Sequence, residues 1–181
     1  MAYEYSENIL VQEAAGNLLQ NELGWEVVFA YNKEKLGADG TFGRMGYQEI
    51  LLRRYFKEAV FRLNPWLNDL LYQEALNKLE YRLSSASPMQ INEEKYALLR
   101  DGIPVQVKQA DGTSKERYVM VFDFDEPERN HFLAVKELKI HGDLYRRRTD
   151  IVGFVNGIPL LFIELKKTTV DVQNAYTDNY M

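Results

Sequence analysis

Two runs of apolar residues on either side of Asn156-Gly157 constrain the fold more than any other part of this sequence. The first run is IVGFV, residues 151–155, and the second is IPLLFI, residues 158–163. Their β-branched and aromatic residues favour strands, and Asn-Gly is a strong signal for the tight turn of a β-hairpin. Because the second run is nearly all apolar, we expect it to be a central strand of a sheet that is covered on both faces.

Helical patterns precede this hairpin. Residues 6–23 predict an amphipathic helix, whose apolar residues are Ile9, Leu10, Ala14, Leu18 and Leu19. Residues 25–31 (WEVVFAY) then favour a strand. The stretch from 44 to about 100 predicts helices over 45–64 and 65–85, broken at Asn64-Pro65, and a third, shorter helix that begins at Ser87-Pro88.

After residue 102 the apolar period changes towards two. Residues 103–109 and 116–124 predict a hairpin, 130–140 another strand, and the segment from about 170 a helix. The order indicates an α/β fold with a mixed central sheet flanked by helices. We therefore expect a single domain over 1–181, with a core of about 6–31 and 102–181 and a helical insertion at about 44–100.

Composition excludes several kinds of site. The sequence has no cysteine, which rules out disulfides, zinc-thiolate sites and cysteine nucleophiles, and which fits a reducing cytoplasm. Its two histidines make a serine-protease triad or a multi-histidine metal centre unexpected. We expect no membrane association, because no apolar stretch reaches the roughly 18 residues that a membrane span needs.

The net charge of −5 argues at first against a nucleic-acid partner. Residues 129–167, however, hold eight Lys or Arg and four acids, a local positive excess. The field at one groove is local, because salt screens charges within about 10 Å. The charge distribution therefore permits DNA binding.

An acidic pair and a lysine stand at the base of the Asn156-Gly157 hairpin. Asp150 begins the first strand, and Glu164 and Lys166 end the second. Residues i and i+2 of a strand share a face, so Glu164 and Lys166 project together, and the turn brings Asp150 back beside them. Two carboxylates are hard oxygen ligands suited to Mg²⁺, and a lysine can orient an attacking water or stabilise developing negative charge.

The register between the two strands of the hairpin decides whether Asp150 and Glu164 lie on the same face. A two-residue loop would pair Asp150 with Ile163 and place Glu164 on the opposite face. A three-residue loop, Asn156 to Ile158, or an equivalent β-bulge, would pair Asp150 with Glu164. We predict one of the latter arrangements, and a regular two-residue hairpin would argue against the site.

A Glu-x-Lys pair on a strand is more often a solvated face or a surface salt bridge, worth about 0–1 kcal/mol. Two features favour a functional site here. The strand before Glu164 is apolar and ends abruptly in charge, and three arginines, Arg146, Arg147 and Arg148, precede Asp150. Arginines are suited to binding phosphates, although a run of them is commonly a solvated edge.

The stretch RRRTDIVGFVNGIPLLFIELKK, residues 146–167, resembles the nuclease motif of the restriction (R) subunit of type I restriction–modification enzymes. The resemblance extends over about 130–181 and more weakly over 6–30. It implies membership of the PD-(D/E)xK nuclease superfamily, with a restriction-endonuclease-like core. It also implies Mg²⁺-dependent cleavage of duplex DNA, with Mn²⁺ as a substitute metal.

The resemblance carries roles to individual positions. Asp150 and Glu164 match the metal-binding acids, Lys166 matches the catalytic lysine, and the backbone carbonyl of Leu165 would be a further ligand. An acid on the first helix often completes such sites, and Glu13 is the candidate, against its alternative as an exposed helix glutamate. Candidate DNA-binding residues are Arg146, Arg147, Arg148 and Lys167.

This sequence departs from the family pattern in two places. Thr149 stands where proline is common. The family also has a Gln and a Tyr about one helical turn apart after the Glu-x-Lys strand, and here Gln173 and Tyr176 are one residue too close, with Thr177 in the expected slot. Gln173 and Tyr180 are the auxiliary candidates.

The family's R subunit also carries an ATP-driven motor, but no Gly-x4-Gly-Lys-Ser/Thr loop occurs here. We therefore expect a nuclease fragment of a longer chain, with ATP used only by that motor and with modification and specificity subunits as partners. The alternatives are a recombination-type exonuclease or resolvase of the same fold, and a docking module with an idle site.

Overall fold

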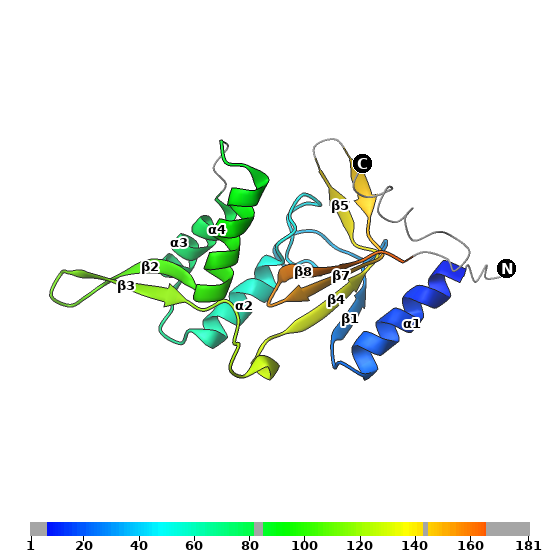
Figure 1. Cartoon of the computed structure of the whole chain (residues 1–181), viewed down its shortest axis with the longest axis horizontal. Coiled ribbons are helices and arrows are strands. Elements are labelled where there is room, and N and C mark those ends of the chain that lie inside the picture. Colours follow the sequence, from blue (N-terminus) through cyan, green and yellow to red (C-terminus); the bar gives the residue numbers. More distant parts are fainter. Residues whose placement is uncertain (1–6, 82–84, 143–144, 166–181) are drawn as a thin grey trace. The chain divides into compact units, whose positions relative to one another are not determined.

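The computed structural model describes residues 7–81, 85–142 and 145–165. The chain divides into two compact units, Met1–Arg54 with His131–Met181, and Tyr55–Asn130. The first unit contains a four-stranded sheet in the order β1-β4-β7-β8 (Figure 1).

This sheet is mixed. Strand β1 (Glu26–Phe29) pairs in parallel with β4 (Phe132–Lys136), and β7 (Ile151–Val155) pairs antiparallel with both β4 and β8 (Ile158–Ile163). The parallel pair joins segments about a hundred residues apart in sequence, which a hairpin cannot do. The α/β class with a mixed sheet is confirmed.

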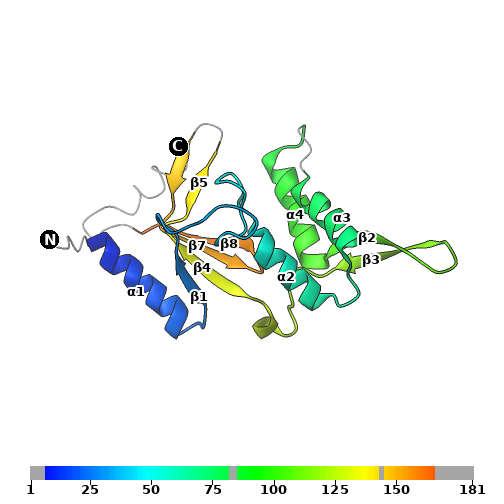
Figure 2. The same cartoon turned by 180° about the vertical axis from the view of Figure 1, so that it is seen from behind.

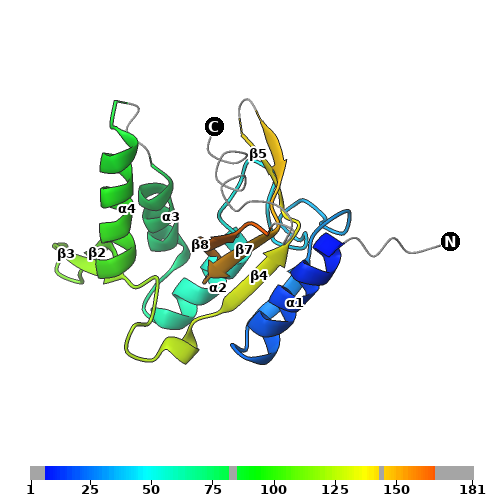
Figure 3. The same cartoon turned by 45° about the vertical axis from the view of Figure 1, so that its right-hand side comes forward.

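Helix α1 (Glu7–Asn21) packs against the sheet near β1 and β4 (Figure 3). Its described buried positions are Gln12, Gly16 and Leu19, spaced as one helix face. A Cβ atom at Gly16 would lie 3.3 Å from Cδ of Lys136, so the helix approaches β4 closely there. The predicted apolar face was partly wrong, because Ala14 is exposed and Leu18 is 56% exposed.

The helix predicted over 45–64 begins only at Arg53, where α2 (Arg53–Leu63) starts. The fully buried Arg44 explains the difference. Its Nε and Nη2 donate to the carboxylate of Glu34 at 2.8 and 2.6 Å, and its Nη1 donates to the backbone carbonyl of Glu49 at 3.0 Å. These contacts hold the segment before α2 in a non-helical path.

The second unit contains the rest of α2, then α3 (Asp69–Glu80) and α4 (Pro88–Asp101), and the hairpin of β2 (Ile103–Lys108) and β3 (Ser114–Val119) (Figure 2). A short 3₁₀ helix, Pro127–Arg129, follows. Helix α4 begins with a capping box between Ser87 and Gln90, which explains the predicted start. No helix in the described part of the chain is long and apolar enough to cross a membrane.

The β2–β3 hairpin is confirmed, but it belongs to the unit that holds the helices and not with the main sheet. Ile103 and Val105 are fully buried, and Lys78 of α3 donates from Nζ to the backbone carbonyl of Pro104 at 2.6 Å. The hairpin therefore uses its apolar residues to complete the helical unit.

The single strand predicted over 130–140 is two strands. Glu137 has a φ of 57°, which interrupts the extended backbone between β4 and β5 (Lys139–His141). Strand β5 then pairs antiparallel with β6 (Arg146–Arg148) as a separate hairpin. This break directs the chain out of the main sheet, and the chain re-enters it at β7.

The expectation that residues 158–163 form a central buried strand is wrong. Among the described strands β8 lies at the edge of the sheet, and its residues Leu160, Leu161 and Phe162 are 55%, 39% and 48% exposed. The central buried strand is β7, in which residues 151–154 are all buried.

Candidate active site

Asp150 and Glu164 take facing positions at the open end of the β7–β8 hairpin. Asn156 and Gly157, both with positive φ, form a two-residue turn that pairs Val155 with Ile158. A bulge between Gly153 and Phe154 then shifts the register, so that Ile151 pairs with Ile163. The next positions outward are Asp150 and Glu164.

The predicted three-residue loop is therefore absent, and the equivalent bulge supplies the same one-residue shift. The turn needs two residues that tolerate positive φ, and Asn-Gly meets that need. Gly153 allows Trp25 and Leu161 to approach the backbone closely beside the bulge, because a Cβ atom there would lie 2.8 Å from Cζ3 of Trp25 and 2.9 Å from Cβ of Leu161. Bulges often adjust the aim of side chains beside functional sites.

Both carboxylate oxygens of Asp150 accept hydrogen bonds. Gln12 donates from Nε2 to Oδ1 at 2.9 Å, and the backbone N–H of Leu165 donates to Oδ2 at 2.7 Å. The carboxylate is thus oriented by α1 on one side and by the residue after Glu164 on the other. Each oxygen keeps a second lone pair that can face a ligand.

Thr149 anchors the residue before Asp150. Its backbone N–H donates to the carbonyl of Leu138 at 3.0 Å, and its hydroxyl donates to the same oxygen at 3.2 Å. The backbone N–H of Glu137 donates to the carbonyl of Asp150 at 2.9 Å. The backbone hydrogen bond of Thr149 uses an N–H donor that a proline at this position would lack.

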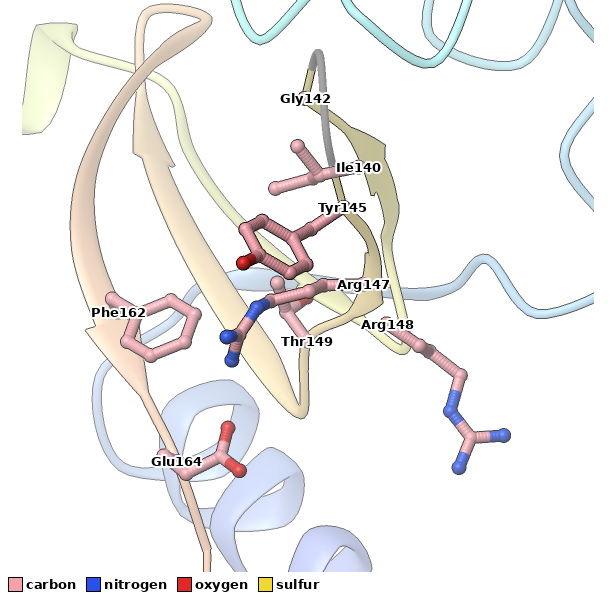
Figure 4. Close-up of a pocket in the computed structure, with 8 residues that line it drawn as sticks. All are labelled: Ile140, Gly142, Tyr145, Arg147, Arg148, Thr149, Phe162 and Glu164. Carbon is pink, nitrogen blue, oxygen red and sulfur yellow. The ribbon is translucent and has the colours of Figure 1, made fainter. Parts of the chain in front are cut away.

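Glu164 follows β8 directly and lines a pocket of about 380 Å³ (Figure 4). Phe162, two residues earlier, lies on the same side of the strand, and the β5–β6 hairpin supplies the opposite wall. Among the described residues no group of three or more His, Cys, Asp or Glu could together hold a metal ion.

The three consecutive arginines do not act as one patch. Arg147 and Arg148 both line the pocket, but it is the guanidinium of Arg147 that points towards Phe162 (Figure 4). The guanidinium of Arg148 points away, pairs with Glu137 at 3.1 Å and lies 4.9 Å from the ring centroid of Tyr31. Arg146 is exposed. Successive side chains of a strand point to opposite faces, so candidate DNA-binding arginines that are adjacent in sequence project in different directions.

On α1 the residue that reaches Asp150 is Gln12, and the adjacent Glu13 is exposed. Successive helix residues are turned by about 100°, so the two side chains point in different directions. Sequence reasoning missed Gln12. The only signal for it was the spacing Gln12, Gly16 and Leu19, which marks the buried face.

The remaining candidates, Lys166, Lys167, Gln173 and Tyr180, lie outside the described residues. The backbone of Leu165 is described, and its N–H donates to Asp150. The ligand role of its carbonyl, which the resemblance implies, stays a prediction. The donor set fits Mg²⁺, because that ion is held in proteins by one or two carboxylates together with waters and substrate phosphates.

The chain is similar in sequence to known proteins over most of its length. A family model for the N terminus of the type I restriction enzyme R protein matches residues 4–180. The chain is 34% identical over 158 residues to the type I restriction enzyme HindI endonuclease subunit of Haemophilus influenzae, an alignment that covers 85% of this chain and 15% of the relative.

Two further relatives align over nearly the whole chain. Identity is 26% over 188 residues to a putative type I restriction enzyme MjaIXP endonuclease subunit of Methanocaldococcus jannaschii, covering 98% of this chain and 17% of the relative. It is 30% over 177 residues to the SauCOLORF180P endonuclease subunit of Staphylococcus aureus, covering 97% and 16%. The chain thus spans about a sixth of the length of these relatives.

Proposed function

Because this chain belongs to the family of type I restriction enzyme R protein N termini, we propose that it is the Mg²⁺-dependent nuclease domain of such a subunit. Its reaction would be hydrolysis of phosphodiester bonds in duplex DNA. The observation that carries the proposal is the bulged register that brings Asp150 opposite Glu164, with both oxygens of Asp150 oriented by hydrogen bonds.

In this mechanism Asp150 and Glu164 would hold the ion, and Gln12 and the N–H of Leu165 would keep the Asp150 carboxylate in place. A bound Mg²⁺ would polarise the scissile phosphate and lower the pKa of an attacking water. Lys166 would orient that water or offset negative charge in the transition state. Arg147 would contact a phosphate of the bound strand.

The wider assembly is part of the same proposal. ATP would be used by a motor outside this chain, and the modification and specificity subunits would meet this domain through the full-length protein. The absence of cysteine from the sequence is compatible with the reducing cytoplasm in which such an enzyme would meet DNA.

The first test is titration calorimetry of Mg²⁺ and Mn²⁺ with the 181-residue chain and its Asp150→Ala and Glu164→Ala variants. Both substitutions should abolish binding while circular dichroism stays unchanged. Glu93→Ala removes an exposed acid from α4 and should leave binding unchanged. If the wild type binds no metal, with or without a short DNA duplex, the docking-module alternative is favoured.

Products separate the nuclease alternatives. An endonuclease converts supercoiled plasmid to nicked and linear forms, and this conversion should require Mg²⁺, Asp150 and Glu164. A recombination-type exonuclease would leave the circle intact and degrade linear DNA. The assay should also be carried out with the full-length protein, because the motor would deliver DNA to the site.

A further inference from the structure

The pocket beside Glu164 has the chemistry of a nucleobase site. It lies between β8 and the β5–β6 hairpin, within one compact unit, and has a volume of about 380 Å³. That is within the range of about 300–1,000 Å³ typical of small-ligand pockets. Figure 4 shows Phe162 on one wall and Tyr145 with Arg147 on the other.

Two large aromatic side chains are left open to solvent here. Phe162 is 48% exposed and Tyr145 is 64% exposed, and Ile140 adds an apolar surface on the hairpin wall. Apolar side chains gathered around a hollow commonly mark a binding site. Flat aromatic rings stack on nucleobases of any sequence, because every base has a π-face.

Charged side chains lie beside the aromatic residues of the pocket. The guanidinium of Arg147 lies 6.0 Å from the ring centroid of Tyr145, so a cation stands beside the aromatic wall. Glu164 forms part of the same lining. It is one of the two acids beside which the scissile phosphate would lie. A ligand that is flat and apolar in one part and anionic in the next fits this arrangement, and a nucleotide in a DNA strand has that pattern.

We propose that this pocket binds one unpaired nucleobase of the DNA strand, next to the phosphate that a metal ion at Asp150 and Glu164 would bind. The base would contact Phe162 and Tyr145, and Arg147 would contact the adjoining phosphate. The inference rests on the proposed nuclease function and adds a substrate preference to it. A base in a duplex must first leave the stack, at a cost of a few kcal/mol, so DNA with an unpaired nucleotide should bind more tightly than fully paired DNA.

The test compares three short duplexes that differ at one position: fully paired, with one extra unpaired adenine, and with an abasic nucleotide in place of that adenine. Binding to the 181-residue chain is measured by fluorescence anisotropy with Ca²⁺ in place of Mg²⁺. The wild type should bind the unpaired adenine about 5- to 20-fold more tightly than the abasic duplex, as expected for one base stacked on aromatic rings. 2-Aminopurine at the same position should be quenched on binding.

Phe162→Leu should bring the ratio of the two affinities close to one and remove the quenching, whereas Arg147→Gln should weaken binding to all three duplexes. Phe124→Leu changes a phenylalanine that is 61% exposed outside the pocket and serves as the matched control. Equal affinity of the wild type for adenine and abasic DNA would overturn the proposal. A ratio that survives Phe162→Leu, or no DNA binding at all, would do the same.

These outcomes are independent of cleavage. A chain that cuts plasmid through Asp150 and Glu164 but ignores the unpaired base keeps the nuclease function and loses this inference. A chain that selects the base but neither binds metal nor cuts DNA keeps the binding site and loses the nuclease function.

Discussion

Nε2 of Gln12 donates a 2.9 Å hydrogen bond to Oδ1 of Asp150, a contact that joins the first helix to the start of β7 across 138 positions of the chain. The bond acts on a carboxylate whose other oxygen is held by the N–H of Leu165. Gln12 is itself only 8% exposed, so its amide cannot exchange this partner for water without rearrangement. We infer that Gln12 is a positioning residue for Asp150.

Gln12→Ala should therefore weaken Mg²⁺ binding about tenfold, because partners that orient a ligand usually contribute 10- to 100-fold to metal affinity. It should also lower the free energy of unfolding by about 0.5–1.5 kcal/mol. Calorimetry and urea denaturation measure the two effects. Glu13→Ala, on the same helix turn, should change metal affinity less than about twofold if its exposed side chain takes no part. The reverse ranking would support Glu13 as the ligand from α1.

Gly153→Ala should lower the free energy of unfolding by about 1–3 kcal/mol, because the added methyl group overpacks the site against Trp25 and Leu161. Gly142→Ala is the control, since its added Cβ atom meets nothing nearer than 3.7 Å. Urea denaturation of both variants measures the difference. Equal stabilities would mean that Trp25 moves aside, and that the bulge does not depend on glycine.

Glu34→Gln should lower the free energy of unfolding by about 3 kcal/mol, because it leaves the fully buried guanidinium of Arg44 without its anionic partner. Glu74→Gln removes the acid of a partly exposed pair with Lys78 and should cost about 0.3–0.5 kcal/mol. Denaturant midpoints at neutral pH make the comparison. A similar small loss at both positions would show that the buried pair is not needed to hold the segment before α2.

Asp111, in the turn of the β2–β3 hairpin, should titrate below the ordinary carboxyl value. The hydroxyl of Thr113 donates to its Oδ1 at 2.6 Å and the backbone N–H of Thr113 donates at 2.9 Å, and these bonds lower its pKa from 3.8. The contribution of the ionised Asp111 to the free energy of unfolding is then complete above pH 3.8. It is lost as the pH falls through the lower pKa that Asp111 has in the folded state. NMR titration of the carboxyl carbon measures the midpoint, and Thr113→Val should move it back upward. A midpoint unaffected by that substitution would contradict the assignment.

Features that depend on neighbouring residues were predictable. The Asn156-Gly157 turn requires two residues that adopt positive φ, and the start of α4 depends on a reciprocal contact between Ser87 and Gln90. The facing positions of Asp150 and Glu164 were predicted by assuming that the two acids share one site, because only a one-residue shift in register brings them together. The position of that shift, at Gly153, required knowledge of Trp25, which is distant in sequence.

Features that depend on distant partners were not predictable. Residues 45–52 have a helical pattern, but the adjacent Arg44 reaches the carboxylate of Glu34 and the backbone carbonyl of Glu49, and these contacts outweigh local propensity. Residues 158–163 have the composition of a central strand, yet β8 is an edge among the described strands. The residues of a strand show how much apolar surface it could bury. How many neighbouring strands it has depends on the rest of the sheet.

The sequence by itself therefore determined the mixed α/β class, the hairpin and the acidic pair at its base, because turn chemistry and side-chain alternation act over a few residues. The tertiary structure decided that Gln12 and not Glu13 reaches Asp150, that the guanidinium of Arg147 points towards Phe162 while that of Arg148 points away, and that Phe162 stays open to solvent. Each of these outcomes depends on the angle at which a helix or hairpin meets the sheet. That angle results from packing between segments far apart in the chain, and no local pattern specifies it.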